Sequence, residues 1–380
     1  MKKLTLALLF SYFLMQATAQ GTNYDYERIR IGDAKHIVSG LALSPDNTTL
    51  AISSIQGYPF YLFDWKNKDI LKQYDVGNWY AGSSVTYSAG GKYVLLNQLY
   101  YIDFALNKDR EVNFEIIQTA NGEQVKRFEE YHSVAITPDE KYALTLTGDE
   151  FGFWNLVTKK KEKSFKIVGA ANSIAINPDG KRIAISRRLT EEDAQRFPAM
   201  QRDKKTLKLY MKYKQLITVY DAETFKEIYT VNELYDIIYK LKFSKDGEWL
   251  LCLNIPHTKL QNTDTDRQSY INVVDAETGE ARRRGFVSKS YYEPDFKVSH
   301  NGKYLGLVSQ NNRFMELHIY DFETGKMRWR FQQSYRLFEK DEEGFLSSDT
   351  RISFVFLSDD ESVMMTGGNY LILWNLTKSQ

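Results

Sequence analysis

Two lysines stand where the surrounding pattern favours small apolar side chains. Lys242 and Lys297 occupy the middle of the apolar stretches "LKFS" and "FKVS", and the matching positions of similar stretches are Ala42, Ala135 and Ala175. A lysine on a crowded inner strand must extend its ammonium to solvent or pair it with an acid. The pattern therefore predicts that these two lysines form a positively charged rim on a channel, and that this rim binds an anionic group. The alternative is an ion pair between neighbouring sheets, or a lysine that points to solvent.

A second group of charged residues fills one long insertion, residues 187–214, with nine Lys or Arg and four acids. Thr190 and the three acids after it predict a helix start, because an acidic first turn complements the helix dipole. The later letters "LKLYMKY" alternate apolar and basic residues, which predicts an extended strand. We interpret the insertion as a basic, aromatic docking arm, with a solvated hairpin that lengthens two strands as the alternative. The partner-binding residues of the docking arm are Arg202, Lys204, Lys205, Tyr210 and Tyr213.

The sequence lacks the common catalytic signatures. It contains no HExxH, GxSxG, SxxK, Walker loop or CxxC motif. Asn262, Asp264 and Asp266 loosely resemble a calcium loop, but Arg267 stands where such a loop needs glycine, so a polar exposed loop is the alternative. The histidines are scattered, at His36, His132, His257, His300 and His318. We therefore predict no catalytic residue, no metal and no cofactor.

The first residues have the layout of a secretory signal peptide. Met1 to Lys3 are followed by an apolar run of 12 residues and by Ala17-Thr18-Ala19. The run is too short for the roughly 20 residues of a membrane-spanning helix, and the small residues suit a cleavage site. We predict a signal peptide over residues 1–19, a secreted or periplasmic protein, and no membrane span after cleavage.

Charge and cysteine content narrow the partner class. Loss of the leader removes two lysines and leaves 48 basic and 49 acidic residues, so no global field would attract nucleic acid or an anionic membrane. Cys252 is the only cysteine, so no intrachain disulfide can form. It lies in the apolar stretch "WLLCLN", where we expect a buried, inert thiol.

The positions of these residues depend on a repeat that runs along the chain. The residues Asn177-Pro178-Asp179-Gly180 strongly favour a tight turn, and the apolar residues that alternate on either side predict the two strands of a hairpin. Similar turns begin at Ser44, Ser88, Thr137, Ser244, Ser299 and Ser358. A second marker, an apolar strand that ends in a polar turn such as "VYDAETFK" or "IYDFETGK", recurs in phase with the first. Strand units repeated at roughly 40 to 65 residues predict an all-β fold, a seven-bladed β-propeller over residues 20–380.

The units resemble the blades of WD-repeat and YVTN-type propellers. The Trp-Asp position reads Trp154-Asn155 and Trp374-Asn375, and the Gly-His signature is missing. The resemblance covers nearly all of the chain after the leader and implies a seven-bladed ring.

The ends of the chain are predicted to complete one blade together. The last repeat stops after its third strand at "LILWNLTKSQ", and the segment from Tyr24 to Gly32 belongs to no other unit. We expect this segment to supply the outer strand of blade seven, because pairing distant chain ends adds little entropy cost. The alternative is a disordered N-terminal tail.

Long connections are predicted to gather on one face of the ring. The short turns join the first strand to the second and the third to the fourth, whereas the insertions fall in the other connections. These insertions are residues 99–113, 187–214, 255–269 and 332–350. Since function concentrates in such loops, we expect a non-enzymatic module that binds a protein partner of the cell envelope through this face. The alternatives are a propeller enzyme of lactonase type, a subunit of a cofactor-dependent dehydrogenase, or a carbohydrate or metabolite sensor.

Overall fold

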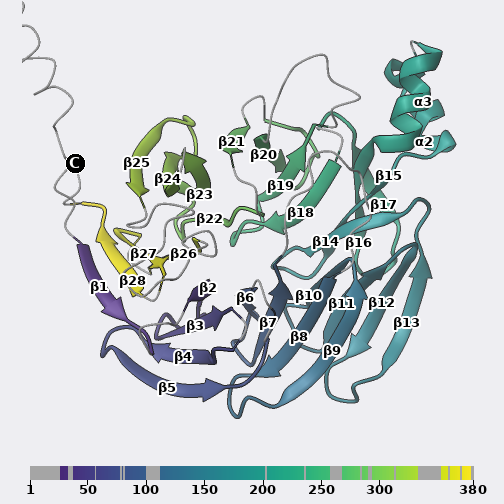
Figure 1. The fold of residues 1–380 in the computed structure, drawn as a ribbon. Helices are drawn as coiled ribbons and strands as arrows, with labels where there is room; N and C mark the ends of the chain where they lie inside the picture. Colours follow the sequence, from purple (N-terminus) through teal and green to yellow (C-terminus); the bar gives the residue numbers. More distant parts are fainter. Residues whose placement is uncertain are drawn as a thin grey trace, which may run out of the picture.

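The chain folds into a ring of seven four-stranded antiparallel sheets, a seven-bladed β-propeller (Figure 1). The computed structural model describes residues 26–32, 37–55, 57–77, 79, 82–99, 112–201, 203–234, 237–256, 268–282, 285–289, 293–311, 314–332, 352–357, 360–368 and 370–377. The fold class predicted from the repeats is therefore confirmed. The expected signal peptide lies outside the described residues.

The first four blades follow one another along the chain. Blade one contains β2 (Val38–Leu43), β3 (Thr49–Ser54), β4 (Phe60–Asp64) and β5 (Asp69–Tyr74). Blade two contains β6 (Ser83–Tyr87), β7 (Tyr93–Gln98), β8 (Val112–Gln118) and β9 (Gln124–Tyr131). Blade three contains β10 (Ser133–Ile136), β11 (Tyr142–Thr147), β12 (Glu150–Asn155) and β13 (Lys161–Lys166). Blade four contains β14 (Ala171–Ile176), β15 (Arg182–Arg188), β16 (Gln215–Asp221) and β17 (Glu227–Val231).

Three further blades complete the ring. Blade five contains β18 (Ile237–Phe243), β19 (Trp249–Ile255), β20 (Gln268–Asp275) and β21 (Phe286–Lys289). Blade six contains β22 (Phe296–Val298), β23 (Tyr304–Asn311), β24 (Phe314–Asp321) and β25 (Met327–Gln332). Blade seven contains β26 (Phe354–Phe356), β27 (Ser362–Gly367), β28 (Tyr370–Asn375) and β1 (Tyr26–Arg30).

The N-terminal strand closes the ring as predicted. In Figure 1, β1 (purple) lies beside β28 (yellow). The two strands pair antiparallel, with Tyr26 opposite Trp374 and Arg30 opposite Tyr370. The rings of Tyr26 and Trp374 lie 4.9 Å apart, and Ile29 is buried beneath the strand. Pairing the first strand with the last removes the open edge that blade seven would otherwise expose.

Apolar layers between neighbouring sheets form the core. Leu144 and Phe151 of blade three, for example, pack against Ile183 and Ile185 of blade four. Comparable clusters of buried residues join each of the other six pairs of adjacent blades. A single sheet cannot bury both of its faces alone, so the ring is stabilised by these shared layers.

The turn between the first and second strands begins one residue early in blade seven. In the other six blades the first turn residue is Ser, Thr or Asn, as expected. In blade seven Leu357 N–H donates to Ser362 O and Asp360 N–H donates to Leu357 O, so Leu357 takes this place. The predicted turn start at Ser358 is wrong, because the pairing of Phe356 with Val363 sets the register.

The strand order fixes the side from which each connection leaves. Connections between second and third strands, and those between blades, leave the ring on one side, which we call the long-connection face. The connection from Arg188 to Gln215 belongs to this class, and so do those that follow β7, β19 and β25. Most residues of the three latter connections lie outside the described residues. The short turns leave on the opposite side.

The insertion of blade four folds into helices, not into extended strands. It contains α2 (Glu191–Arg196), a 3-10 turn (Pro198–Gln201) and α3 (Lys204–Tyr213). The helix start at Thr190 is confirmed, and Thr190 caps α2. The predicted strand extension is wrong, and so is the alternative hairpin. Asp203 accepts hydrogen bonds from the N–H groups of Lys205 and Thr206 and starts a helix instead.

Candidate functional site

A buried ion pair anchors the helices of the insertion to blade four. The guanidinium of Arg187 donates to both carboxylate oxygens of Asp193, at 2.6 and 2.8 Å. Arg187 Nε donates to Thr218 Oγ1 on the neighbouring strand, and Thr190 donates to Asp193 through its N–H and its hydroxyl. Burial alone would raise the pKa of Asp193, but these donors outweigh it and lower the pKa. The base of the insertion is therefore held in one geometry.

The helix α3 rests on this base through an apolar side. Leu207, Tyr210 and Met211 pack against a small cluster. Its buried members are Leu189, Ala194, Met200 and Leu216. Lys214 after the helix donates to Leu234 O at 3.0 Å. Of the predicted docking residues, Tyr210 is thus partly used in packing.

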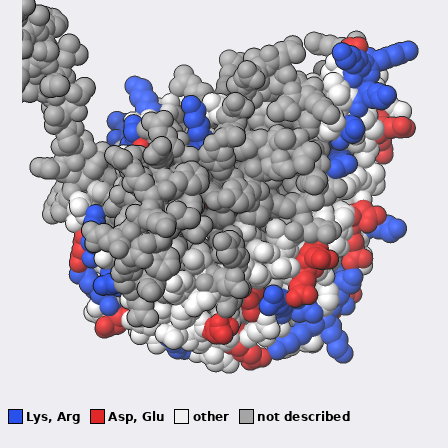
Figure 2. Space-filling model, viewed as in Figure 1, with Lys and Arg blue, Asp and Glu red and all other residues white. Residues whose placement is uncertain are grey.

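The opposite side of α3 presents four exposed lysines, Lys204, Lys205, Lys208 and Lys212, which we call the lysine stripe. No acid lies in the first turn of α3, and none of the ion pairs among the described residues includes a stripe lysine. Figure 2 shows basic side chains gathered at the upper right, where Figure 1 places α3. Lys204 and Lys205 of the predicted site belong to the stripe, and Tyr213 lies at its end. Arg202 lies outside the described residues.

Serine is the most frequent residue at one level of the inner strands, around the central channel. Four residues before each short turn, the inner strands or the segments leading into them carry Gly40, Ser84, Ser133, Ser173, Lys240, Asp295 and Ser353. At four seams this side chain accepts from the backbone N–H of the next blade. The four pairs are Ser133 with Ile174, Ser173 with Leu241, Asp295 with Phe354, and Ser353 with Leu41. Serine thus joins neighbouring sheets at the channel.

Blade five interrupts this pattern with Lys240, whose ammonium can only donate. Lys240 forms an ion pair with Glu293, which precedes blade six. Lys242 and Lys297, which the sequence analysis predicted as anion-binding residues, follow Lys240 and Asp295 by two residues and lie deeper in the channel. Three cations and two carboxylates, those of Glu293 and Asp295, therefore meet where blades five, six and seven converge.

Lys297 is fully bonded inside the protein. Its ammonium donates to Asp295 Oδ2 at 2.6 Å, to Leu41 O at 3.2 Å and to Phe354 O. These acceptors come from three different blades or their leading segments. The ion pair with Asp295 lies within blade six and its leading segment, and the carbonyls of Leu41 and Phe354 join Lys297 to blades one and seven. Burial lowers the pKa of Lys297, and Asp295 counteracts this effect.

Lys242 is bonded less completely. Its ammonium donates to Phe296 O at 3.2 Å, lies 4.5 Å from the centre of the Phe296 ring, and stands 3.8 Å from Asp295 Oδ1. The side chain is 30% exposed, yet it belongs to an innermost strand that neighbouring blades enclose. Burial, together with the charges of Lys240 and Lys297, lowers its pKa to about 7.

Asp295 connects the charges of the cluster. Besides Lys297, it accepts from Ser353 Oγ at 2.6 Å. Burial alone would raise the pKa of Asp295, but Lys297 and Lys242 outweigh it and lower the pKa to about 2. We did not predict Asp295, Glu293 or Lys240 as site residues. A signal for them existed, since "YYEPDFKVS" and "IIYKLKFS" both place charged residues at alternate positions leading into the inner strands.

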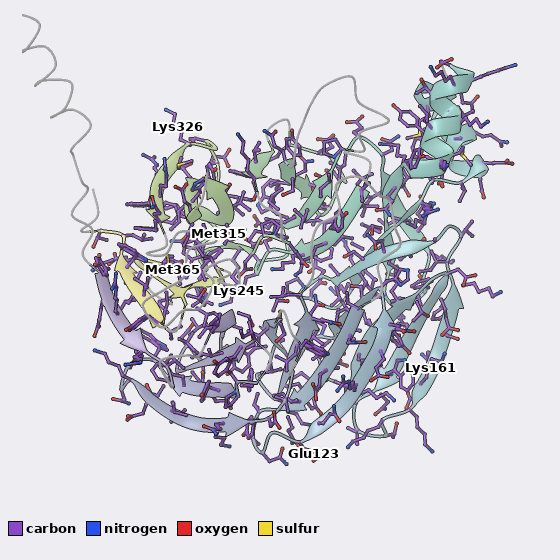
Figure 3. The ribbon with its side chains drawn as sticks, in the orientation of Figure 1. Glu123, Lys161, Lys245, Met315, Lys326 and Met365 are labelled. Atoms are coloured by element: carbon purple, nitrogen blue, oxygen red, sulfur yellow. The ribbon has the colours of Figure 1, made fainter. Side chains whose placement is uncertain are left out.

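A cavity opens beside this cluster. It has about 460 Å³ of empty space, part of it open to solvent. Its polar lining includes Ser84, Lys240, Glu293, Asp295 and Ser353, and Leu99, Val308, Met315 and Ile352 form an apolar wall. Figure 3 labels Met315 in blade six, toward the centre of the ring, and Lys161 on the outer strand of blade three. Since the cavity is lined by strand ends of the long-connection face, it lies on the same side as the helices of blade four.

The other candidate residues that the structure describes do not form a metal site. His300 pairs with Asp360 in the short turns, and His318 pairs with Glu316 within blade six. Among the described residues no group of His, Cys, Asp and Glu is arranged to hold a metal ion. The possible calcium loop at residues 262–266 lies outside the description. Cys252 is buried, which raises the pKa of its thiol, as expected for an inert side chain.

The fold and this face define the class of the protein, a seven-bladed β-propeller that carries a helical insertion. No protein-family model and no curated protein matches the chain. No helix within the described ranges is long and apolar enough to cross a membrane.

Proposed function

We propose that the protein is a secreted or periplasmic, non-enzymatic scaffold that holds an acidic protein partner on its long-connection face. In this proposal the lysine stripe of α3 is the principal docking surface. The leader sequence supports the location, and the repeats support a kinship with WD-repeat or YVTN-type propellers.

The observation behind the proposal is a charge pattern that folding alone does not require. Lys204 and Lys205 lie in the first turn of α3, where cations oppose the helix dipole. Lys204, Lys208 and Lys212 follow one another at intervals of four residues, and each such like-charged pair destabilises a helix by about 0.2–0.5 kcal/mol. An acidic surface would relieve both effects.

The orientation of α3 favours a protein partner over a lipid surface. The apolar residues of α3, Leu207, Tyr210 and Met211, face the propeller. A helix that lies in a membrane interface directs its apolar side to the lipid instead. The Arg187–Asp193 pair anchors α2 to blade four, and α3 packs on the cluster beside it. A helix backbone that is held in place loses less entropy on binding.

Site-specific photo-crosslinking in the native host tests the proposal. A photoreactive residue at position 208 is expected to capture one defined protein with an acidic surface. Substituting Lys204→Glu and Lys212→Glu in the same chain should abolish the adduct. The control is a photoreactive residue at Lys181, which is exposed in the short turn of the same blade. Equal adducts at both positions, lipid adducts alone, or no adduct would contradict the proposal.

A further inference from the structure

Among the residues that the structure describes, the charges at the channel do not balance. Lys240, Lys242 and Lys297 face the carboxylates of Glu293 and Asp295, and the neighbouring inner strand of blade four contributes the uncharged Ala175 at this level. Lys240 pairs with Glu293, and Lys297 pairs with Asp295 at 2.6 Å. Lys242 is left with a carbonyl at 3.2 Å and a carboxylate oxygen at 3.8 Å, which is beyond hydrogen-bond distance.

The fold itself does not require a cation at this position. The equivalent residues, two before each short turn, are alanine in blades one, three and four, threonine in blade two and valine in blade seven. Burying a charge without full compensation is unfavourable, so an alanine or methionine would be the more stable choice. The small side chains at the same level of the ring also leave Lys242 partly exposed to the channel.

We propose that the Lys242 ammonium is the binding group of a site for one small monovalent anion, a carboxylate, in the central channel. Bound there, the carboxylate would receive charge-assisted hydrogen bonds from Lys242 and restore neutrality to the cluster of three cations and two acids. A divalent anion such as sulfate would overcompensate the single excess positive charge. Glu293 and Asp295, already bonded to lysines, would also repel it. The site is independent of the lysine stripe and does not rest on the proposed scaffold function.

Titration of the full mature chain with acetate, followed by calorimetry at pH 6 and at pH 9, tests the site. Because Lys242 has a pKa of about 7, only about one chain in a hundred keeps the cation at pH 9. The apparent affinity is therefore expected to fall roughly 100-fold between the two pH values. Equal affinity at pH 6 and pH 9 would overturn the proposal.

Two substitutions separate loss of the site from loss of the fold. Lys242→Ala places the residue of blades three and four at this position and should abolish acetate binding at both pH values. Lys242→Arg keeps a permanent cation, so binding should persist and lose its dependence on pH. The control Lys181→Ala should bind acetate as the parent chain does. Acetate binding by the alanine variant would refute the site.

A second titration distinguishes a free small carboxylate from a carboxylate carried by a partner. The probe is a short peptide with a single glutamate, compared with the same peptide carrying glutamine. Binding of acetate assigns the site to free carboxylates, and binding of the glutamate peptide alone assigns it to a partner side chain. If neither probe binds to the parent chain at pH 6, the proposal is wrong.

Discussion

The guanidinium of Arg187 and the carboxylate of Asp193 meet through two nearly equal hydrogen bonds, 2.6 and 2.8 Å long, where the helices leave blade four. Both side chains are less than one-tenth exposed. The pair joins the last residues of β15 to the first turn of α2, six residues further along the chain. It therefore anchors α2 to blade four, and α3 with its lysine stripe packs on the apolar cluster beside it.

Breaking this pair should destabilise the protein strongly. Asp193→Ala leaves the Arg187 charge buried and unpaired, for which the expected loss is about 3–5 kcal/mol of unfolding free energy. Urea unfolding followed by circular dichroism measures the change. The matched control is Arg196→Ala, which removes the half-exposed pair with Glu227. There the expected loss is below about 1 kcal/mol. Similar losses in the two variants would show that the buried pair has no special structural role.

A second prediction concerns the acid in the short turn of blade three. Glu140 has a φ of 57°, in the left-handed region, where blades four and five have Gly180 and Gly247. Its carboxylate reaches the turn of blade two and accepts from Gly90 N–H at 2.9 Å and from the Ser88 hydroxyl. The hydrogen bonds between turns thus compensate the strained backbone.

Two substitutions at Glu140 separate these effects. Glu140→Gly loses the hydrogen bonds but removes the strain, and we expect it to lower stability by about 1–3 kcal/mol. Glu140→Ala loses the same bonds and keeps a Cβ in the left-handed region, so it should cost about 1 kcal/mol more. Thermal unfolding of both variants gives the order. An alanine variant at least as stable as the glycine variant would contradict the strain argument.

The repeated elements could be predicted from the sequence because their signals are local. Asn177 to Gly180 specify a turn without help from the rest of the chain. The segment around Ile29 belonged to no repeat, so only blade seven, which lacked a fourth strand, could take it. The turn start of blade seven was predicted incorrectly. The sequence matches the turn motif from Ser358, one residue after Leu357, where the turn begins in the structure. Its register is set by strand pairing and by the core around Phe356, which no short stretch encodes.

The site was predicted less completely, for two physical reasons. The residues of α3 alternate as in a strand, but Leu207, Tyr210 and Met211 also have the three- and four-residue spacing of a helix, and the Asp203 cap decides between the two. At the channel, Lys242 and Lys297 were recognisable as cations in apolar strands. The role of Asp295 depends on Ser353, 58 residues away, which the packing of blade six against blade seven brings to it.

The last prediction follows from the unequal protonation of Lys242 in the folded and unfolded chains. Its pKa is about 7 in the folded protein and 10.5 in its ordinary state, so between these pH values the unfolded chain binds the additional proton. Stability contributed by this group therefore rises as the pH increases from about 7 to about 10.5. Lys242→Met lacks this dependence: in acetate-free buffer it should be more stable than the parent chain at pH 6, by a margin that shrinks toward pH 10. Urea unfolding at pH 6, 8 and 10 measures the margin, and Lys181→Met, at an exposed position in the short turn of blade four, is the control. A margin for Lys242→Met that does not change with pH would mean that the buried ammonium keeps its proton throughout, and that its charge is balanced within the fold.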